Sequence, residues 1–574
     1  MSVDRFAVAG ALREIGARLE LQGGNPFKAR AYERGARALE AFNGDLDALV
    51  SERRLTSLPG VGAALAGTIA EVHATGRSER LERLRRALPP GILELSQVAH
   101  LTLARIRALH EALGISTVAE LKAAAEAGRV RGVKGFGPKT EEKLRAGIRE
   151  FETRGEAVLL SEAEREGEAL LAHARATPGV RQVDLAGALR RRTEIVDRLV
   201  VTVATADPAA AVERFARHPQ AVAVIGRDLT GCTVRLAAGL VAELQTAPHA
   251  AYAGLLHEMT GSAAHRARLA QRARELGLEL DRRGLARIRT RRRCPVKSEA
   301  DLYRHLGLPW MPPELREDVG EVEAALAGEL PADLLEEDDI QGLVHCHTVY
   351  SDGRHTVEQM ARAAEEMGMK YITITDHSPT ASYARGLTLD RLKRQWEEID
   401  RAQEKVKVRL LRGTESDILA DGALDYPDRV LEQMDVVIAS IHNRHGMDEG
   451  QMTRRVVRAL RHPLFKVWGH ALGRYVQSRP PIAVRMEEVL DAAAESRVAI
   501  EVNGDPHRLD LEPRWQREAR RRGIRFVVST DAHSIRELGH VRYGVAMARR
   551  GWLGKGDVLN TRGVEEFRSA VRPS

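Results

Sequence analysis

The sequence has few cysteines and no long apolar run. Cys232, Cys294 and Cys346 are its only cysteines, and they lie far apart in a chain of 574 residues. An odd number of scattered thiols argues against a disulfide framework and is typical of a reducing compartment. No apolar run approaches the roughly 18 residues that a membrane span requires, and no signal peptide is recognisable. We therefore expect a cytoplasmic protein that has no membrane contact.

The charge balance lacks a strong excess of either sign. Lysine and arginine number 88 against 81 aspartates and glutamates, which gives a net charge of +7. This modestly basic balance is compatible with a polyanionic partner but does not require one. With 43% hydrophobic and 29% charged residues, the composition is that of an ordinary globular protein. The length allows several domains.

What the sequence does contain is a series of potential metal ligands, which starts at His345 and His347. These histidines end an apolar segment, and Asp352 comes shortly after. On a strand, residues i and i+2 point to the same side, so His345 and His347 can reach one ion while Cys346 faces away. An isolated pair of this kind is more often packed or solvent-facing, so the prediction depends on whether further ligands recur later in the chain.

The segments after this pair alternate short apolar runs with amphipathic stretches. This alternation predicts parallel strands and helices that close towards a barrel. The predicted strands are Leu343–Cys346, Tyr371–Thr375, Val408–Arg412, Asp435–Ser440, Phe465–Gly469, Ala499–Val502 and Arg525–Ser529.

Residues able to bind a metal come just past each predicted strand. In such barrels the active site is built at the carboxyl ends of the strands, so an accidental placement after all seven is improbable. The sequence therefore predicts a multinuclear metal site, whose mixed imidazole and carboxylate ligands suit manganese or zinc without deciding between them. The residues are His345, His347 and Asp352, then Asp376 and His377, Glu415 and Asp417, His442, His470, Glu501 and Asn503, and Asp531 and His533.

These segments resemble the successive motifs of the PHP (polymerase and histidinol phosphatase) family. The motifs lie at residues 345–353, 374–378, 413–418, 440–443 and 529–534. The resemblance implies a distorted (β/α)7 barrel that holds three divalent ions, with His345, His347, Glu415 and Asp531 in catalytic positions. It further implies that Glu415 bridges two ions completed by His345, His347, Asp531, His442 and His470, and that Asp352, His377 and His533 hold the third.

Two glycine-containing turns precede helical segments in the amino-terminal region. Gly60 and Gly62 form one, and Gly135 and Gly137, followed by Lys139, form the other. Both are typical of helix-hairpin-helix motifs, in which backbone N–H groups at a helix start approach a phosphate without side-chain interference. Ordinary helical turns remain the alternative, because neither motif alone is rare. Together they favour sequence-independent contact with a DNA backbone.

The segment Thr260-Gly261-Ser262, the run at residues 306–318 and the order of the modules make the amino-terminal half similar to the family X DNA polymerases. The whole chain resembles the bacterial enzymes that fuse such a polymerase to a PHP domain. The resemblance implies a multidomain α+β and α/β protein. Its expected parts are an N-terminal helical domain (residues 1–90), fingers with the second helix-hairpin-helix (91–155), a nucleotidyltransferase-like palm (156–248), a thumb (249–320), an acidic linker (321–339) and the PHP domain (340–574).

The palm departs from the family pattern of three metal-binding carboxylates. In an ungapped match, Arg198 and Val200 occupy two of the carboxylate positions, and Glu243 stands in for the third aspartate. Shifting the match by one residue restores Asp197 but leaves Leu199. Because polymerisation needs two ions, we expect templated synthesis to be weak or absent and a palm Mg²⁺ or Mn²⁺ pair to be lacking. The alternative is that Asp197 and Glu243 hold one manganese ion for residual extension.

Two sets of basic residues are candidate phosphate contacts. Arg474 and Arg508, together with Asn503, lie near the predicted barrel mouth, where salt bridging at a strand end is the alternative. The second set is the densest basic cluster of the chain, for which a solvated thumb surface is the alternative. It comprises Arg282, Arg283, Arg287, Arg289, Arg291, Arg292 and Arg293.

The sequence thus predicts a nucleoid-associated DNA-repair protein that acts on gapped, nicked or 3′-ended DNA. Clustered divalent ions clamp a phosphodiester and generate a hydroxide near neutral pH, so we expect metal-dependent 3′→5′ exonuclease activity with manganese favoured. The alternatives are a manganese-dependent gap-filling polymerase that uses deoxynucleoside triphosphates, a PHP phosphatase and a non-catalytic DNA-end scaffold.

Overall fold

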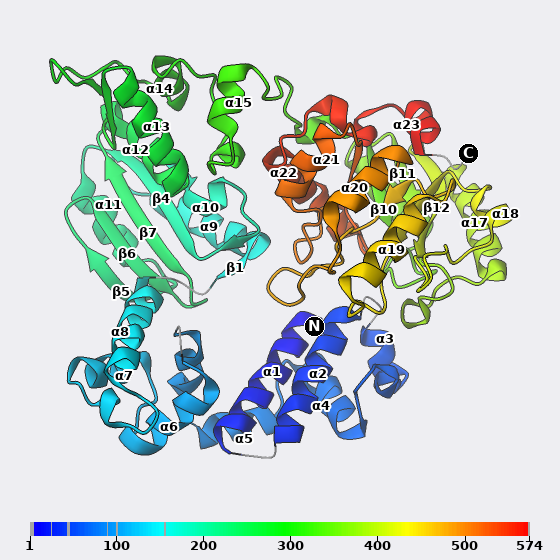
Figure 1. Ribbon diagram of the computed structural model, residues 1–574, viewed down its shortest axis with the longest axis horizontal. Coiled ribbons are helices and arrows are strands. Elements are labelled where there is room, and N and C mark those ends of the chain that lie inside the picture. Colours follow the sequence, from blue (N-terminus) through cyan, green and yellow to red (C-terminus); the bar gives the residue numbers. More distant parts are fainter. Residues whose placement is uncertain are drawn as a thin grey trace. The chain divides into compact units, whose positions relative to one another are not determined.

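The computed structural model describes residues 5–23, 26–42, 46–88, 90–98, 101–153 and 157–571 (Figure 1). The chain forms two compact units. One comprises Met1–Arg154 with Ser382–Arg385, and the other comprises Gly155–Ala381 and Gly386–Ser574. The expected boundary between fingers and palm, at residues 155 and 156, lies outside the described residues.

The first unit is helical and has two apolar cores. Val8, Leu12 and Ile15 recur at helical spacing on its first helix and are fully buried in one core. Ile106 and Leu109 belong to the other core, which covers the expected fingers. The helices are α1 (Arg5–Leu21), α2 (Pro26–Ala41), α3 (Leu46–Ser51), α4 (Ala63–Thr75), α5 (Glu79–Ala87), α6 (Leu103–Leu113), α7 (Val118–Glu126) and α8 (Pro138–Thr153).

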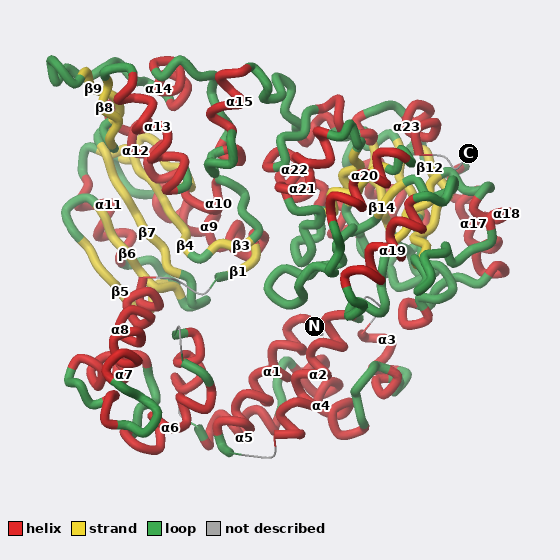
Figure 2. The backbone as a smooth tube through the Cα atoms, in the orientation of Figure 1, coloured by secondary structure: helices red, strands yellow, loops and turns green. Residues whose placement is uncertain are grey.

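The second unit begins with the expected palm, a five-stranded sheet (Figure 2). Its strand order is β2-β4-β7-β6-β5. The interior strand β4 is buried on both faces: Leu199 and Val201 pack towards α9 and α11, while Val200 faces Tyr252 of α12. The elements are β1 (Val158–Leu159), α9 (Leu160–Arg175), β2 (Val180–Ala186), α10 (Gly187–Arg190), β3 (Ile195–Val196), β4 (Arg198–Thr205), α11 (Pro208–Ala216), β5 (Ala221–Arg227), β6 (Gly231–Leu236) and β7 (Val241–Ala247).

The expected thumb comes after the expected palm and is stabilised by buried charges. Arg316 is fully buried, pairs with Glu299 and donates from Nε to the Met311 carbonyl oxygen, 2.9 Å away. Glu299 also accepts from Arg190 of the palm at 2.7 Å. The thumb elements are α12 (Tyr252–Thr260), α13 (Ala263–Glu275), β8 (Leu278–Asp281), β9 (Gly284–Arg287) and α14 (Glu299–His305).

The segment expected to be an acidic linker, residues 321–339, begins with a helix. Its first part is helix α15 (Glu321–Ala327), which belongs to the thumb. Glu321 is fully buried and lies 2.6 Å from Nδ1 of His265, and Val322 joins the apolar core of the thumb. The acidic composition suggested a solvated segment because the sequence does not show that Glu321 has a buried partner.

The expected PHP domain is a nearly closed barrel of seven parallel strands that succeed one another in sequence order. Backbone hydrogen bonds close it after the last strand, where His347 N donates to the Ala532 carbonyl oxygen at 2.8 Å. The strands are β10 (Gly342–Cys346), β11 (Tyr371–Ile374), β12 (Arg409–Asp417), β13 (Val436–Ser440), β14 (Val467–Trp468), β15 (Ala499–Asn503) and β16 (Phe526–Ser529).

Both faces of these strands are buried. Val344, Leu411 and Ile438 belong to the core inside the barrel, whereas neighbouring residues such as Leu343 pack towards the covering helices. The helices are α16 (Val357–Glu366), α17 (Leu389–Gln403), α18 (Asp428–Leu431), α19 (Glu449–Leu460), α20 (Met486–Glu495), α21 (Pro513–Arg521), α22 (Val541–Arg550) and α23 (Val564–Val571).

All seven predicted barrel strands are present, with one shifted boundary that affects the site. Strand β12 extends to Asp417, so Glu415 and Asp417 lie within the strand rather than just past it. Alternation then places these two carboxylates on the same side of the strand. The sequence prediction ended this strand at Arg412 because Gly413 interrupts the apolar run.

The buried pair in the thumb gives a stability prediction. Replacement of Arg316 by alanine leaves the Glu299 carboxylate buried with less compensation, which typically costs about 3–5 kcal/mol. We expect a clearly lowered thermal transition of the second unit by calorimetry. The control is Arg304→Ala, because Arg304 is 76% exposed and its pair with Asp301 adds little. Equal transitions for the two variants would contradict the expected importance of the buried pair.

Candidate metal centre

The predicted ligands converge at the carboxyl ends of the barrel strands. Three of them, His345, His470 and Asp531, have positive φ angles of 64°, 23° and 50°. Non-glycine residues rarely adopt this conformation, and such strain is concentrated at functional sites. All nine predicted ligands are largely buried, and His533 is the most accessible, with 21% of its side chain exposed.

Glu415 lies at the centre of the cluster and faces imidazoles with both oxygens. Its Oε2 is 3.0 Å from Nδ1 of His377 and 3.3 Å from Nε2 of His345. Its Oε1 is 2.7 Å from Nε2 of His470 and 3.1 Å from Nε2 of His442. Two oxygens directed at two different sets of histidines have the arrangement required of a bridging carboxylate.

Asp352 forms the other side of the cluster. Its Oδ1 lies 3.4 Å from Nε2 of His533, and its Oδ2 lies 3.5 Å from Nε2 of His377. His347 stands between the two sides: its Nδ1 is 3.8 Å from Asp352, and its Nε2 is 3.4 Å from Asp531. The structure therefore brings all nine predicted ligands into one continuous cluster.

The donor set fits divalent cations. His345 directs Nδ1 at Glu501, at 2.5 Å, and a neutral ring that donates there turns the Nε2 lone pair towards Glu415 and Asp531. Facing acceptors repel one another unless a proton or a cation lies between them. Several of these atoms are buried without a hydrogen bond, including His345 Nε2, both ring nitrogens of His347, Asp352 Oδ2 and Glu415 Oε2. A bound cation would satisfy them.

Carboxylates behind the ligands hold the imidazoles in place. Glu501 contacts Nδ1 of His345 and also accepts a hydrogen bond from the backbone N–H of His470. Asp417 lies 2.5 Å from Nδ1 of His442. Such partners fix the tautomer and orientation of a ligating histidine. The sequence placed Glu501 and Asp417 at strand ends but did not distinguish them from ligands, because only the structure shows which ring atom each one contacts.

Asp376 has a different role in the same region. It is fully buried and accepts hydrogen bonds from the backbone N–H groups of Thr348 and Ser351 and from the side chain of Gln395. It thereby stabilises the loop between His347 and Asp352. Burial raises the pKa of the Asp376 carboxyl above its usual range, while these hydrogen bonds lower it.

The three expected phosphate contacts differ in what they do. Arg508 is buried, with Nε 3.0 Å from Oδ2 of Asp531, so it brings a positive charge to the cluster. Asn503 donates to the Glu501 and Asp531 carboxylates, at 3.1 and 3.3 Å, and accepts from the backbone N–H of Asp505. Its side chain is thus occupied in positioning Asp531.

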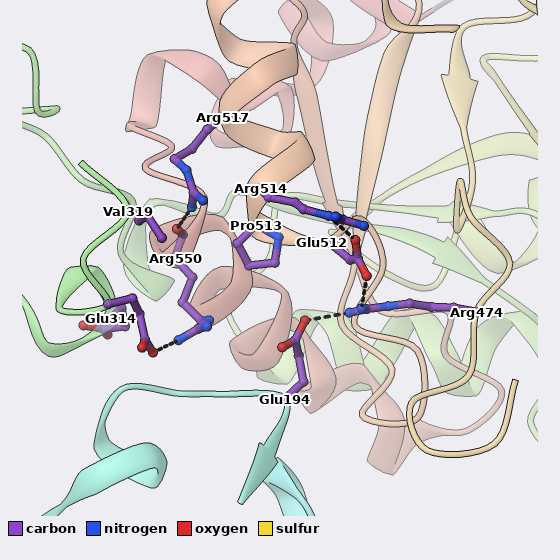
Figure 3. A pocket seen from close by; sticks show the side chains of 10 residues that line it. Glu194, Glu314, Val319, Arg474, Glu512, Pro513, Arg514, Arg517 and Arg550 are labelled. Carbon is purple, nitrogen blue, oxygen red and sulfur yellow. Dashed lines mark hydrogen bonds and ion pairs between the residues drawn. The ribbon is translucent and has the colours of Figure 1, made fainter. Parts of the chain in front are cut away.

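Arg474 does not face the metal cluster in the way that the sequence suggested. Figure 3 shows its guanidinium between the carboxylates of Glu194 and Glu512, at 2.8 and 3.1 Å. Its Nε donates to the Arg508 carbonyl oxygen at 3.0 Å. These contacts line a cavity of about 380 Å³ where the palm meets the barrel. Arg474 therefore joins these two parts, which corresponds to the salt-bridge alternative.

The palm face expected to carry catalytic carboxylates holds an ion pair. Arg198 Nη1 lies 2.8 Å from Oε2 of Glu243 on the parallel neighbouring strand. Val200 is paired in register with Glu243 and is buried, so it offers no ligand. Leu199, the residue left by the shifted match, is fully buried on the opposite face. Among the described residues, the potential metal clusters of three or more ligands all lie in the barrel.

Both glycine turns of the first unit have the geometry that the motif requires. Gly60 and Gly135 have φ angles of +78° and +91°, which side chains rarely adopt. Gly62 and Gly137 precede α4 and α8, and a Cβ atom added to either would meet nothing within 4 Å. The surface beside each helix start is therefore open, and Lys139 is exposed next to the second turn.

Comparison with known proteins identifies the same parts. Residues 344–505 match the PHP domain, 255–317 the DNA polymerase beta thumb, 4–78 a helix-hairpin-helix domain and 92–150 a SAM-like helix-hairpin-helix tandem. A DNA polymerase/3′-5′ exonuclease PolX of Bacillus subtilis is 33% identical over 564 residues, which cover 98% of each chain. The chain belongs to the PolX family.

Other relatives of this PolX chain are shorter. A probable phosphatase of Thermoanaerobacter sp. is 28% identical over 229 residues, which are 38% of this chain and 89% of its own. A probable phosphatase of Aliivibrio fischeri is 27% identical over 231 residues, which are 38% of this chain and 88% of its own.

Family membership confirms the expected fold class, with helix-hairpin-helix modules, a polymerase thumb and a PHP barrel. The PHP domain and its clustered ligands support divalent metal binding, and the hairpin and thumb modules support DNA binding. In the described part of this PolX chain, no helix is long and apolar enough to span a membrane.

The cluster also shifts the pKa values of its members. Burial would raise the pKa of the Glu415 carboxyl, but His442 and His345 hold it well below its usual range. Burial lowers the pKa of His533, whereas Asp352 raises it, and the result is a pKa of about 9. The carboxylates are therefore ionised and ready to bind a cation at neutral pH, while His533 retains a proton in the absence of metal.

The hydrogen bond that Glu501 accepts from His345 gives a prediction about metal affinity. Glu501→Gln keeps the size of the side chain but removes the charge that orients His345. We expect metal affinity to fall by about 10–100-fold, as is typical when such a partner is removed. Metal content and a calorimetric titration of the full chain measure this. Glu495→Gln, at a site 69% exposed, is the control. Equal affinities for the two variants would show that Glu501 does not orient a ligand.

The pKa of His533 gives a prediction about pH. Binding of a cation at His533 displaces the proton that this imidazole holds below about pH 9. Apparent metal affinity should therefore fall as pH falls from 9, by up to about tenfold per pH unit for each displaced proton. Titrations in two buffers of different ionisation enthalpy measure proton release directly. His533→Gln should release fewer protons, and unchanged release would exclude His533 as the proton source.

Proposed function

We propose that the PHP barrel hydrolyses phosphodiester bonds at DNA 3′ ends with divalent metal ions, while the palm carries out little or no templated synthesis. The convergence of the nine predicted ligands around Glu415 supports this proposal most strongly. The PolX relative, named as both polymerase and 3′-5′ exonuclease, supports the direction of cleavage. We place this activity in cytoplasmic, nucleoid-associated DNA repair on gapped, nicked or 3′-ended substrates.

The ligand cluster suggests three ions, manganese first and zinc second. Two would share Glu415, one completed by His345, His347 and Asp531 and the other by His442 and His470. The third would be held by Asp352, His377 and His533. Bound there, divalent ions polarise a phosphoryl oxygen and lower the pKa of water.

The remaining chemistry falls to residues of the chain. Arg508 is buried beside Asp531, where its fixed positive charge favours an entering phosphate. Asn503 holds the Asp531 carboxylate in place, and Glu501 holds His345. The two glycine turns of the first unit would bind the DNA backbone without reading its sequence. His533 is the most accessible residue of the cluster, and its imidazole lies at the edge that faces solvent.

A gap-filling polymerase is disfavoured by the ion pair between Arg198 and Glu243. The guanidinium places a fixed positive charge where the family places metal-binding carboxylates, and Val200 adds no ligand. Among the described residues, the candidate clusters of three or more metal ligands lie in the barrel and not on this face, which disfavours the pair of ions on which transfer from a deoxynucleoside triphosphate depends.

Hydrolysis of phosphate monoesters by the same ligands is a second candidate, and the probable phosphatases among the relatives favour it. The two helix-hairpin-helix modules and the polymerase thumb favour DNA as the main substrate. A non-catalytic scaffold is disfavoured by the full-length relative, which is named as an exonuclease.

One reaction tests the proposal. A 5′-labelled primer annealed to a longer template is incubated with manganese and all four nucleotides, and the products are separated by length. We expect the primer to be shortened. The rate of shortening should fall by more than about a hundredfold in His345→Ala, because this variant loses a metal ligand. Loss of a residue that only orients a ligand typically costs about 10–100-fold. Glu243→Ala should shorten the primer normally.

The opposite pattern identifies the rival function. Lengthening that persists in His345→Ala but disappears in Glu243→Ala would mean that the palm is a working polymerase. Hydrolysis of a small monoester without shortening of the primer would instead favour the phosphatase. Unaltered primer in the presence of manganese and of zinc would refute the nuclease proposal.

A further inference from the structure

We propose that the cavity where the palm, the thumb and the barrel meet binds a small anion that carries a phosphate group. The volume of this junction cavity, about 380 Å³, lies in the range of small-molecule sites. None of the nine predicted metal ligands lines it, so the inference goes beyond the proposed function, which concerns the metal cluster. The charged side chains that line the junction cavity include Glu194, Glu314, Arg474, Glu512, Arg517 and Arg550.

The glutamates of the junction cavity already have cationic partners. Each of the four lies within 3.1 Å of an arginine nitrogen, and the pairs are Glu194 with Arg474, Glu512 with Arg474, Glu317 with Arg550 and Glu314 with Arg549. The negative charges of the cavity are therefore compensated within the protein, and the charge that remains decides which ligand fits.

The remaining charge is that of Arg517, which forms no ion pair with a carboxylate among the described residues. Its Nη1 donates instead to the Arg550 carbonyl oxygen at 3.1 Å, and its guanidinium lies 5.4 Å from the centre of the Trp552 ring. Burial lowers the pKa of Arg517, and the nearby charges of Arg550 and Arg521 lower it further. The strongest charged neighbours of this group are thus arginines, and an anion beside it would relieve their repulsion.

Arg550 lies beside Arg517 and has donor capacity that the protein leaves unused. Its Nη1 lies 3.0 Å from Glu317, whereas its Nε is buried without a hydrogen-bond partner among the described residues. In Figure 3, Arg517 and Arg550 lie on one side of Pro513, and the ion pairs of Arg474 lie on the other. Two guanidinium groups on one side of the cavity therefore have bonding capacity for an added anion.

Helix α21 brings further positive potential to the junction cavity. It has nine residues and begins at Pro513, which lines the cavity. Its N-cap Glu512 makes no side-chain cap, because the carboxylate lies 3.1 Å from Arg474 and 2.8 Å from Arg514. The dipole of a helix favours an anion near its first turn. Since Arg517 lies about one turn beyond Pro513, the helix start and the guanidinium act on the same space.

A phosphate group matches this arrangement better than a carboxylate does. A terminal phosphate presents three oxygens, so it can accept from both guanidinium groups and still face the helix start. Guanidinium groups bind such oxygens through paired N–H donors. Two sources offer this chemistry. One is free phosphate, and the other is the nucleoside 5′-monophosphate that hydrolysis at a DNA 3′ end releases, a source that rests on the proposed function.

The test measures binding to the metal-free full chain, so it depends neither on metal ions nor on hydrolysis. The chain is titrated calorimetrically with inorganic phosphate, with dAMP and with deoxyadenosine. We expect phosphate and dAMP to bind and deoxyadenosine not to bind, because deoxyadenosine lacks the phosphate group. Similar affinities for phosphate and dAMP would identify free phosphate as a sufficient ligand, and tighter binding of dAMP would identify a mononucleotide.

Substitution of Arg517 locates the ligand. Arg517→Gln should lower the affinity for phosphate and dAMP by about tenfold or more, because hydrogen bonds to a charged group are lost. The control is Arg461→Gln, at a site that is 65% exposed. It makes the same change of charge away from the junction cavity and should bind as the unaltered chain does.

A second variant covers the case in which loss of Arg517 disturbs folding. Val319 lines the junction cavity and is 44% exposed, so Val319→Glu should be tolerated by the fold while its carboxylate repels an anion. The control is Val224→Glu on β5, where the side chain is 50% exposed. Equal affinities of each variant and its control would overturn the proposal. Equal binding of dAMP and deoxyadenosine, or no binding of phosphate and dAMP, would overturn it as well.

Discussion

The mouth of the barrel depends on the burial of one carboxylate, Glu415, among imidazoles on both of its sides. Burial of a charge is costly unless it is compensated, and the facing histidines supply that compensation through protons or through a shared cation. The surrounding structure is built for this purpose. His345, His470 and Asp531 adopt strained backbone conformations, and Glu501 and Asp417 fix the rings that face Glu415. The parallel strands supply the rigidity that holds these groups together, because both of their faces are packed.

The palm meets the same physical requirement in a different way. A group of carboxylates on adjacent strands needs positive charge nearby, and in a polymerase two metal ions provide it. Here the guanidinium of Arg198 provides it for Glu243, at 2.8 Å. A covalently attached charge of this kind stabilises the sheet but neither coordinates a triphosphate nor activates a hydroxyl group. The palm therefore retains its fold and its contacts with the barrel, such as that between Glu194 and Arg474, although the metal-binding residues of its face have changed.

The sequence predicted much of this arrangement because periodicity and ligand type are local properties. Each of the seven apolar runs became a strand, and the histidines and acids near their ends became one cluster, since parallel strands direct their carboxyl ends to the same edge. Arg474 was placed near the mouth for the same reason, but its role depends on Glu194, which is distant in sequence. Glu321 has a fully buried partner in His265, which composition alone does not show. Long-range pairing of charges was thus the part that the sequence left open.

The distribution of charge also distinguishes the barrel mouth from the glycine turns that are proposed to contact DNA. The carboxylates of Asp352, Glu415, Asp417, Glu501 and Asp531 are buried at the barrel mouth, and Arg508 lies 3.0 Å from Asp531. Bound divalent cations would offset these carboxylates and offer a phosphate oxygen a positive partner, so cleavage depends on them. The glycine turns of the first unit offer backbone N–H groups instead and need no metal to contact a phosphate. We therefore expect capture of the backbone and cleavage of the bond to be separable, because the first depends on these turns and the second on the cluster around Glu415.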